Sequence, residues 1–364
     1  ASHNPAKYNG YKCYNENGYQ MTDEEASETY DFIQKVDYFT GIKTMDFDEA
    51  KEKGLIEYMG QDVIDLFLDE VIKQCVNMGI CEKANLNIIY TPLNGTGNKP
   101  VRKILDRIGV KNIHIVPEQE NPDGNFPTCP FPNPEIKQAF ECALKLAENV
   151  KPDLLLATDP DCDRVGIAVN NGNGEFQLMT GNEVGAMLLN YLLSQKKEQG
   201  TLSKNSIAVK SFVSMLICEM AAYYKAQGKT LIDVMNGLYD EFGYYCNTVQ
   251  SYTFEGASGM EKMAAIMDGL RVNKPSSFAG YEVTKIDDYK TSKSTDVKTG
   301  EESEITLPKS NVLAYTLTDG NKVIVRPSGT EPKIKAYITA VGTSEENAKQ
   351  IAQKLLKDAD ELMK

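Results

Sequence analysis

The sequence has no run of 18 apolar residues, no CxxC pair and no excess of positive charge. Without such a run, no segment is long enough to cross a membrane as a helix. The 52 acidic residues outnumber the 39 basic ones, and the net charge of −13 creates a field that repels nucleic acid and anionic lipid. We therefore expect no nucleic-acid or membrane partner, and any anionic ligand must be held by a few local cations.

The eight cysteines have no regular spacing, which is typical of free thiols in a reducing compartment. The first residues, ASHNPAKYNGYK, do not have the pattern of a signal peptide. With 41% hydrophobic and 25% charged residues the composition is that of a globular protein, and 364 residues suggest about two or three domains. We expect a cytoplasmic protein.

Strands and helices alternate along the first two thirds of the chain. A short apolar run at 86–95 stops at proline and glycine, and apolar residues at helical spacing follow at 99–109. Thr180 and Glu183 have the spacing of a capping box that begins a helix. The alternation predicts an α/β fold with a mainly parallel, doubly wound sheet. The other elements expected here are a strand at 112–117, a helix at 136–150, a buried strand that runs into a polar loop within 152–164, and a hairpin of 165–170 and 175–180.

The last third has a different organisation. Strands are expected around 312–317, 322–326 and 334–339, with helices at 261–271 and about 345–363. This order predicts a separate α+β domain. The charged segment 290–304 is expected to be an exposed loop of that domain.

An acidic loop follows the apolar segment LLLAT. Asp159, Asp161 and Asp163 alternate along it, so their carboxylates can converge on one hard divalent cation at the carboxyl end of the strand. An EF-hand is excluded because Arg164 stands where that loop needs glycine and Asn170 where it needs glutamate. A solvated turn remains the alternative.

A second loop, between the strands expected at 322–326 and 334–339, combines cations with small hydroxylated residues. Its glycine and hydroxyl side chains can form a nest for an anion, Arg326 can bind a phosphate through two N–H groups, and Lys333 adds a point charge. A glycine-centred hairpin with exposed cations is the alternative. The residues of this candidate phosphate site are Arg326, Ser328, Gly329, Thr330 and Lys333.

The N-terminal segment contains a serine beside one of the two histidines. Ser2 and His3, between turn-forming residues, can present a hydroxyl nucleophile or a phosphoserine. This signal alone is weak, since chain ends fray. Together with a cation site and an anion nest it indicates phosphoryl transfer, which needs mainly charge neutralisation and positioning. The other histidine, His114, is expected to be a structural residue of a strand.

These motifs resemble those of the α-D-phosphohexomutase family, the phosphoglucomutases and phosphomannomutases, and in particular its larger bacterial phosphoglucomutase/phosphopentomutase-like branch. The stretches that carry the resemblance are ASHNPAKYNGYK, DPDCDR and RPSGTEPKIKAY, in the family's order. TPLNGTG, NPDGNFP, TGNEVGA and TFEGASGMEKMAAIMDGLR fit as well. The resemblance implies doubly wound mixed sheets and a C-terminal α+β domain.

The resemblance also implies roles for single residues. Ser2 matches the serine that carries the phosphoryl group, and its phosphate would bind Mg²⁺ together with Asp159, Asp161 and Asp163. His3 and Lys12 match residues that transfer a proton or stabilise charge near that serine, and Arg164 would contact the phosphoserine region. The residues that would hold the non-reacting phosphate of the sugar are Arg326, Ser328, Gly329, Thr330 and Lys333.

The implied reaction converts glucose 1-phosphate to glucose 6-phosphate through a bound glucose 1,6-bisphosphate, which also serves as activator. A small sugar phosphate is therefore the expected partner. Phosphomannomutase and phosphopentomutase activity remain alternatives, because the Gly-Glu-Glu-Ser-Gly-type loop that reads the sugar hydroxyls is not found. A catalytically inactive fragment that binds sugar phosphate is the alternative from another class.

The resemblance implies four domains, of which parts are lacking here. The expected division is the remainder of phosphoserine domain 1 at 1–60, metal-binding domain 2 at 61–204, a remnant of sugar-binding domain 3 at 205–252 and phosphate-binding domain 4 at 253–364. Either the polypeptide lacks these parts, or the sequence joins pieces of a longer protein. We expect the second, because a chain that starts inside domain 1 would leave sheet edges unpaired.

Overall fold

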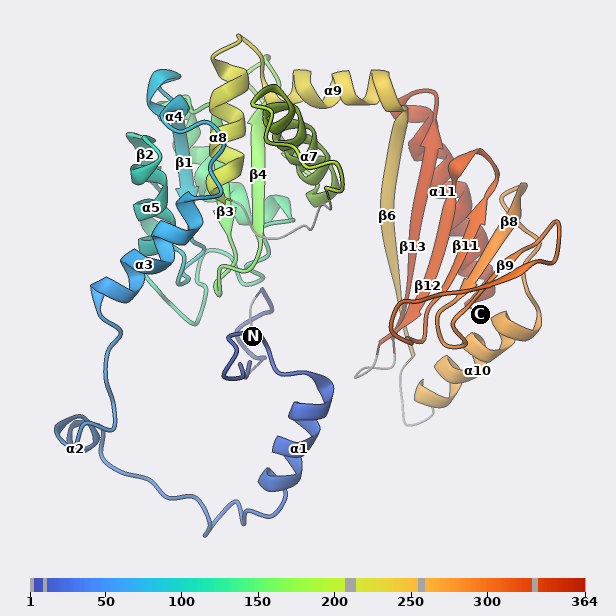
Figure 1. Ribbon diagram of the computed structural model, residues 1–364, viewed down its shortest axis with the longest axis horizontal. Coiled ribbons are helices and arrows are strands. Elements are labelled where there is room, and N and C mark those ends of the chain that lie inside the picture. Colours follow the sequence, from blue (N-terminus) through green and yellow to red (C-terminus); the bar gives the residue numbers. More distant parts are fainter. Residues whose placement is uncertain (1–2, 9–11, 207–213, 255–258, 329–332, 364) are drawn as a thin grey trace. The chain divides into compact units, whose positions relative to one another are not determined.

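The computed structural model describes residues 3–8, 12–206, 214–254, 259–328 and 333–363. The chain divides into two compact units, residues 1–234 and 235–364 (Figure 1). In the described part of the chain, no helix has the length and apolar character needed to span a membrane.

The first unit is built on a five-stranded mixed sheet with the order β2-β1-β3-β4-β5. The central strand pairs are parallel, β1 with β2 and β1 with β3, whereas β4 and β5 are added antiparallel. The sheet is thus mixed and contains the expected hairpin, but it is less parallel than the alternation alone predicts. The strands are β1 (Asn87–Thr91), β2 (Asn112–Ile115), β3 (Leu154–Thr158), β4 (Val165–Asn170) and β5 (Phe176–Met179).

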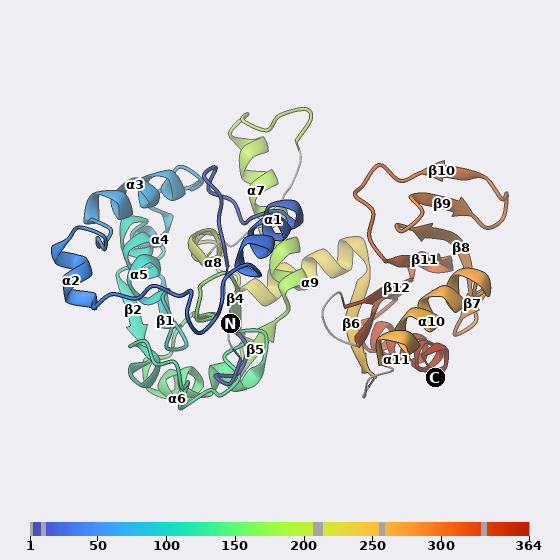
Figure 2. The same cartoon turned by 90° about the horizontal axis from the view of Figure 1, so that it is seen from below.

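Helices lie on both faces of this sheet, as a doubly wound fold requires. Figure 2 shows α6 (Glu141–Val150) on one side of the sheet and α5 (Asn98–Arg107) and α8 (Ser214–Lys225) on the other. Ile89 and Leu155 belong to the core cluster that includes residues of α6. Because side chains alternate between the faces of a strand, their neighbours Ile88 and Leu156, which are also buried, face the other helices.

The start of α7 (Gly181–Glu198) follows the predicted capping box. The hydroxyl of Thr180 accepts a hydrogen bond from the Glu183 backbone N–H (3.3 Å), and the Glu183 carboxylate accepts one from the Thr180 backbone N–H (2.7 Å). His114 lies on β2, as expected for a strand histidine. The remaining helices before β1 are α1 (Asp23–Ile33), which buries no side chain, α2 (Phe47–Glu52), α3 (Gln61–Ile72) and α4 (Ile80–Lys83).

A buried carboxylate fixes α8 in the first unit. Glu219 on α8 has no exposed surface, and its carboxylate accepts hydrogen bonds from the backbone N–H groups of Val76 (3.0 Å) and Asn77 (2.8 Å), between α3 and α4. It also accepts one from the hydroxyl of Tyr191 on α7 (2.7 Å). A buried charge is tolerated only when its oxygens are hydrogen-bonded, so these three donors join α8 to α7 and to the α3–α4 turn.

The second unit is an antiparallel sheet with the order β10-β9-β8-β11-β12-β13-β6, and the short β7 (Ser277–Phe278) pairs with β8. Helices α10 (Gly259–Val272) and α11 (Glu345–Leu362) contribute Met267 and Leu355 to one core that covers one face of the sheet. Helix α9 (Leu231–Phe242) precedes β6. The strands are β6 (Tyr244–Thr253), β8 (Tyr281–Asp288), β9 (Lys293–Asp296), β10 (Glu302–Glu304), β11 (Leu313–Leu317), β12 (Lys322–Pro327) and β13 (Lys333–Gly342).

The expectation that 290–304 is an exposed loop is wrong. The segment contains β9 and β10, which form a hairpin beside β8, and an ion pair between Lys293 and Glu302 (2.7 Å) connects the two strands. The strands are made of polar residues because they lie at the edge of the sheet, where most of their side chains meet water. Local composition therefore does not reveal that β9 pairs with β8 and that β10 pairs with β9.

The division into four domains remains a prediction. Within the structure α8 packs against α4, α5 and α7, and β6 pairs with β13 along its whole length. The segment 205–252, expected to be the remnant of one domain, thus places α8 in the first unit and β6 in the second.

We expect Glu219→Ala to lower the free energy of unfolding of the first unit by about 3 kcal/mol, because it leaves one buried and two partly buried donors without their acceptor. Urea unfolding followed by circular dichroism measures this change. Glu82→Ala, which removes an exposed carboxylate from α4, should change stability by less than about 0.5 kcal/mol. Equal losses in the two variants would contradict the role of Glu219.

Candidate active site

The acidic loop begins where β3 ends. Asp159 is fully buried, and its side chain accepts a hydrogen bond from the Arg164 backbone N–H (2.8 Å). The backbone N–H of Cys162 donates to the Asp159 carbonyl (2.9 Å), and Cys162 itself has a φ of 59°. These bonds fold the loop back on its first residue, so that the carboxylates of Asp159, Asp161 and Asp163 offer oxygens within 4.8 Å of one another.

This arrangement suits a hard divalent cation. Three carboxylates supply oxygen ligands only, and oxygen ligands are what Mg²⁺ and Ca²⁺ select in proteins. Only Asp159 is buried, so the other two carboxylates leave one side of the loop accessible to a further ligand. The convergence is the geometry that a cation site needs, and the metal site itself remains a prediction.

Lys12 lies on the acidic loop, although 149 residues separate it from Asp161 in the sequence. Its Nζ is 2.6 Å from the Asp161 carboxylate and 2.7 Å from that of Asp163. The hydrogen bond to Asp161, and to a smaller extent the one to Asp163, raise the pKa of Lys12 well above its usual range. Lys12 therefore stays protonated while it contacts this loop.

His3 lies near the same loop. Its ring centroid is 6.1 Å from that of Phe131, and partial burial, followed by the positive charge of Arg164, lowers the pKa of His3. The carboxylates of Glu135 and Asp163 oppose this shift. Arg164, whose charge acts on His3, is itself 3.5 Å from the Glu135 carboxylate. A lowered pKa keeps more of the imidazole neutral, the form that accepts a proton.

The support of the acidic loop is a feature that the sequence reasoning missed. The loop TPLNGTG after β1 lies against it, and Thr96 donates to the Pro160 carbonyl from both its backbone N–H (2.8 Å) and its hydroxyl (3.1 Å). A Cβ on Gly95 would lie 2.5 Å from that carbonyl oxygen, and one on Gly97 would lie 2.9 Å from the Cys162 sulfur. The two glycines therefore allow the loops to touch. The motif TPLNGTG could have indicated this contact, because it follows β1, which pairs with β3.

The second unit holds the described part of the predicted phosphate loop. Arg326 lies on β12 and is exposed, and the turn closes where the Ser328 backbone N–H donates to the Lys333 carbonyl (2.7 Å). Gly329 and Thr330 lie outside the described residues, as does Ser2. Strand register adds a cation that the motif reasoning did not single out, because Lys335 on β13 is directly opposite Arg326 and is also exposed.

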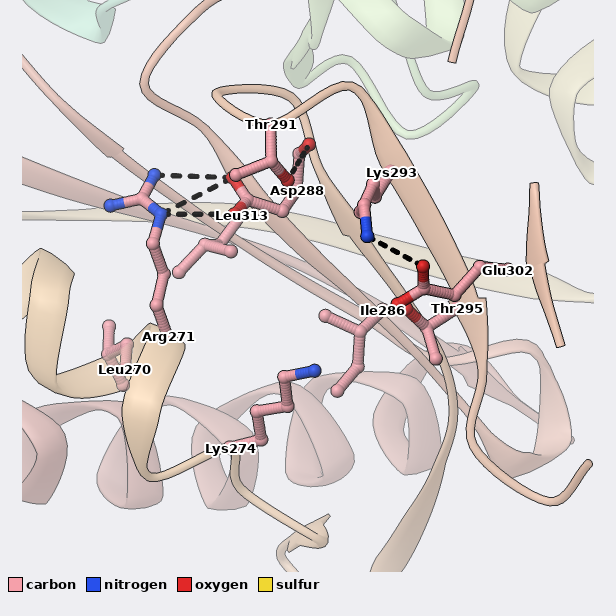
Figure 3. Close-up of a pocket in the computed structure, with 10 residues that line it drawn as sticks. All are labelled: Leu270, Arg271, Lys274, Ile286, Asp288, Thr291, Lys293, Thr295, Glu302 and Leu313. Atoms are coloured by element: carbon pink, nitrogen blue, oxygen red, sulfur yellow. Dashed lines mark hydrogen bonds and ion pairs between the residues drawn. The ribbon is translucent and has the colours of Figure 1, made fainter. Parts of the chain in front are cut away.

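A pocket of about 70 Å³ lies elsewhere in the second unit, between the end of α10 and strands β8, β9 and β11 (Figure 3). Two of its lining cations form ion pairs with acids, Arg271 with Asp288 (3.2 Å) and Lys293 with Glu302 (2.7 Å). Among the described residues of the predicted phosphate loop, none lines this pocket. It is thus separate from that loop.

Comparison with known proteins identifies the family. Residues 1–39 match the model of phosphoglucomutase/phosphomannomutase alpha/beta/alpha domain I, residues 65–173 that of domain II, and residues 279–357 that of the C-terminal domain. A phosphoglucomutase of Staphylococcus saprophyticus is 30% identical, in an alignment that covers 93% of this chain and 72% of the relative. The chain belongs to the phosphoglucomutase/phosphomannomutase family.

Other relatives agree with this assignment. A phosphoglucomutase of Staphylococcus aureus is 30% identical over 93% of this chain and 71% of its own length. The crystal structure of parafusin, a phosphoglucomutase from Paramecium, in its open form superposes with a TM-score of 0.64, at 15% identity, over 100% of this chain and 76% of that one. The family's members are mutases, isomerases that transfer a phosphoryl group on a hexose phosphate. The predicted family, fold class and class of enzyme are therefore confirmed.

We expect Gly95→Ala to weaken the binding of a divalent cation by about tenfold or more, because the added methyl group pushes the Pro160 backbone and with it the acidic loop. Titration calorimetry with Mg²⁺ measures this change. Gly124→Ala is the matched control, since a Cβ at Gly124 would have nothing within 4 Å. Unchanged affinity in Gly95→Ala would show that the contact does not shape the loop.

Proposed function

We propose that this chain interconverts glucose 1-phosphate and glucose 6-phosphate, with Ser2 as the carrier of the phosphoryl group. The observation that carries the proposal is the cluster at the end of β3, where Lys12 and the acidic loop lie beside His3. His3 directly follows Ser2 in the sequence, and the proposal places the serine at this cluster. Membership in a family of mutases supports the same reaction.

In the proposed first step, the bond between phosphorus and the serine Oγ breaks as a bond to the free hydroxyl oxygen of the sugar phosphate forms. Neutral His3 takes the proton of the hydroxyl and passes it to the Oγ of Ser2, which leaves phosphorus as a serine hydroxyl. The product is glucose 1,6-bisphosphate. When this intermediate has turned over in the site, its other phosphoryl group returns to Ser2, and the proton returns to the oxygen that is released.

The charges of the site fit this chemistry. Asp159, Asp161 and Asp163 would hold Mg²⁺ together with the phosphate on Ser2, and the bound ion would neutralise the charge that develops during transfer. Arg164, beside His3, would contact the phosphoserine region. The carboxylates thereby act as ligands and not as bases.

The second unit supplies the proposed site for the phosphate that does not react. Arg326, Ser328, Gly329, Thr330 and Lys333 would hold it, as the resemblance implies. Lys335 adds a further positive charge to the exposed face of the sheet that carries Arg326. Two like charges opposite each other on neighbouring strands destabilise a sheet unless an anion lies between them, which favours a phosphate here.

Three further points belong to the proposal. Phosphomannomutase or phosphopentomutase activity is the second candidate, and a comparison of kcat/KM for the three sugar phosphates distinguishes them. A catalytically inactive protein that binds sugar phosphate is the third candidate.

We also propose a cytoplasmic location, since the eight cysteines are free thiols.

We expect Ser2→Ala to lower kcat for glucose 1-phosphate by more than about a thousandfold, because no other group carries the phosphoryl group. A coupled assay for glucose 6-phosphate measures this. Ser27→Ala, which removes an exposed hydroxyl from α1, should leave kcat unchanged. Full activity of Ser2→Ala would contradict the phosphoserine mechanism. Binding of sugar phosphate without conversion by the unaltered chain would favour the inactive protein.

We expect Arg326→Ala to raise KM for the sugar phosphate about tenfold to hundredfold, because a charge-assisted hydrogen bond to phosphate is lost. Lys322→Ala removes a charge from the other end of the same strand and should change KM by less than about twofold. Steady-state kinetics at saturating Mg²⁺ measure both. Equal effects in the two variants would indicate a general effect of charge and not a phosphate contact.

A further inference from the structure

The ammonium of Lys12 contacts two of the three carboxylates that a divalent cation would use. It lies 2.6 Å from Asp161 Oδ2 and 2.7 Å from Asp163 Oδ2, and both carboxylates belong to the group that can hold a metal ion. Lys12 comes from the N-terminal segment and reaches the loop from outside the β3–β4 connection. A second segment of the chain therefore supplies a positive charge to the acidic loop.

Electrostatics explains why a cation of the chain lies here. Three carboxylates with oxygens within 4.8 Å repel one another, and a single ammonium shared by two of them offsets part of this repulsion. Mg²⁺ binds carboxylate oxygens at about 2.0–2.1 Å and withdraws the lone pairs to which the ammonium donates. A dication and an ammonium on the same two carboxylates would also repel each other.

We propose that Lys12 is a resident counter-ion of the acidic loop, which a divalent cation displaces when it binds. The inference rests on the proposed function, because it takes this loop as the metal site. The proposal describes an exchange in which a divalent cation takes the place of the Lys12 ammonium at the carboxylates. The carboxylates have a positive charge beside them in both states, and the side chain of Lys12 changes its partner.

The exposure of the groups makes the exchange feasible. The side chain of Lys12 is 39% exposed, and those of Asp161 and Asp163 are 33% and 41% exposed. Ion pairs this accessible to water are individually weak, so a divalent ion can replace them. A buried pair would hold Lys12 in place and close the loop to metal.

The exchange couples the metal to the segment that carries Ser2. Lys12 and Ser2 are ten positions apart, and His3, between them, already lies near the loop. When the cation binds, the Lys12 ammonium is released from the carboxylates and becomes available to phosphoryl oxygens in the same site. Coupling of this kind is reciprocal, so removal of Lys12 must tighten the binding of metal.

The test measures Mn²⁺ binding by the signal of free Mn²⁺ in electron paramagnetic resonance, on the whole chain after phosphatase treatment. We expect Lys12→Met to tighten the dissociation constant between about twofold and thirtyfold, since two weak ion pairs no longer have to be broken. Lys12→Arg, which keeps the charge, should bind Mn²⁺ much as the unaltered chain does. Lys7→Met removes one charge from the same segment and should have no effect beyond about 1.5-fold.

The other outcomes contradict the proposal in separable ways. Equal or weaker binding in Lys12→Met would overturn the exchange, and equal tightening in Lys7→Met would reduce it to a general effect of charge. Asp161→Asn separates this inference from the proposed function. If Asp161→Asn weakens Mn²⁺ binding while Lys12→Met has no effect, the metal site stands and the exchange falls. If Asp161→Asn has no effect, the loop is not the metal site and both fall.

Discussion

The mutual repulsion of three carboxylates at the end of β3 is the constraint on which the site of the first unit depends. A buried strand delivers Asp159 to the interior, and the hydrogen bonds within the loop turn Asp161 and Asp163 toward it. Such a concentration of negative charge persists only with positive charge beside it. Lys12, Arg164 and the proposed metal each supply positive charge to these carboxylates. The contact of Lys12 with Asp161 and Asp163 brings the N-terminal segment to the loop at the end of β3.

The same electrostatic logic, with the sign reversed, applies to the second unit. There the sheet presents Arg326 and Lys335 side by side on a face that no described helix covers, in a chain whose net charge is −13. The core on the opposite face, where α10 and α11 pack, keeps the strands in register and thereby keeps the two cations adjacent. Successive side chains of β12 and β13 point to opposite faces of the sheet, so the same strands supply apolar residues to the core and cations to the exposed face.

The sequence predicted those parts of the structure that depend on local pattern. The acidic loop, the capping box of α7 and the apolar strands of both sheets each depend on a short stretch of sequence, and the structure contains them. What was missed depends on contacts between distant segments. The contact of Gly95 with Pro160 needs two strands to be neighbours, and the burial of Glu219 needs the α3–α4 turn to supply donors. The motif that contains Gly95 does not name Pro160 as its neighbour, and a glutamate in a helix does not reveal its donors.

The hairpin of β9 and β10 has a bearing on solubility. Strand β10 ends the order of the described strands on its side of the sheet, and its three residues, Glu302 to Glu304, are all exposed. An open strand edge invites other chains to pair with it, and carboxylates on that edge discourage them by charge and hydration. The segment that looks like an unstructured loop therefore acts as a gatekeeper against edge-to-edge aggregation.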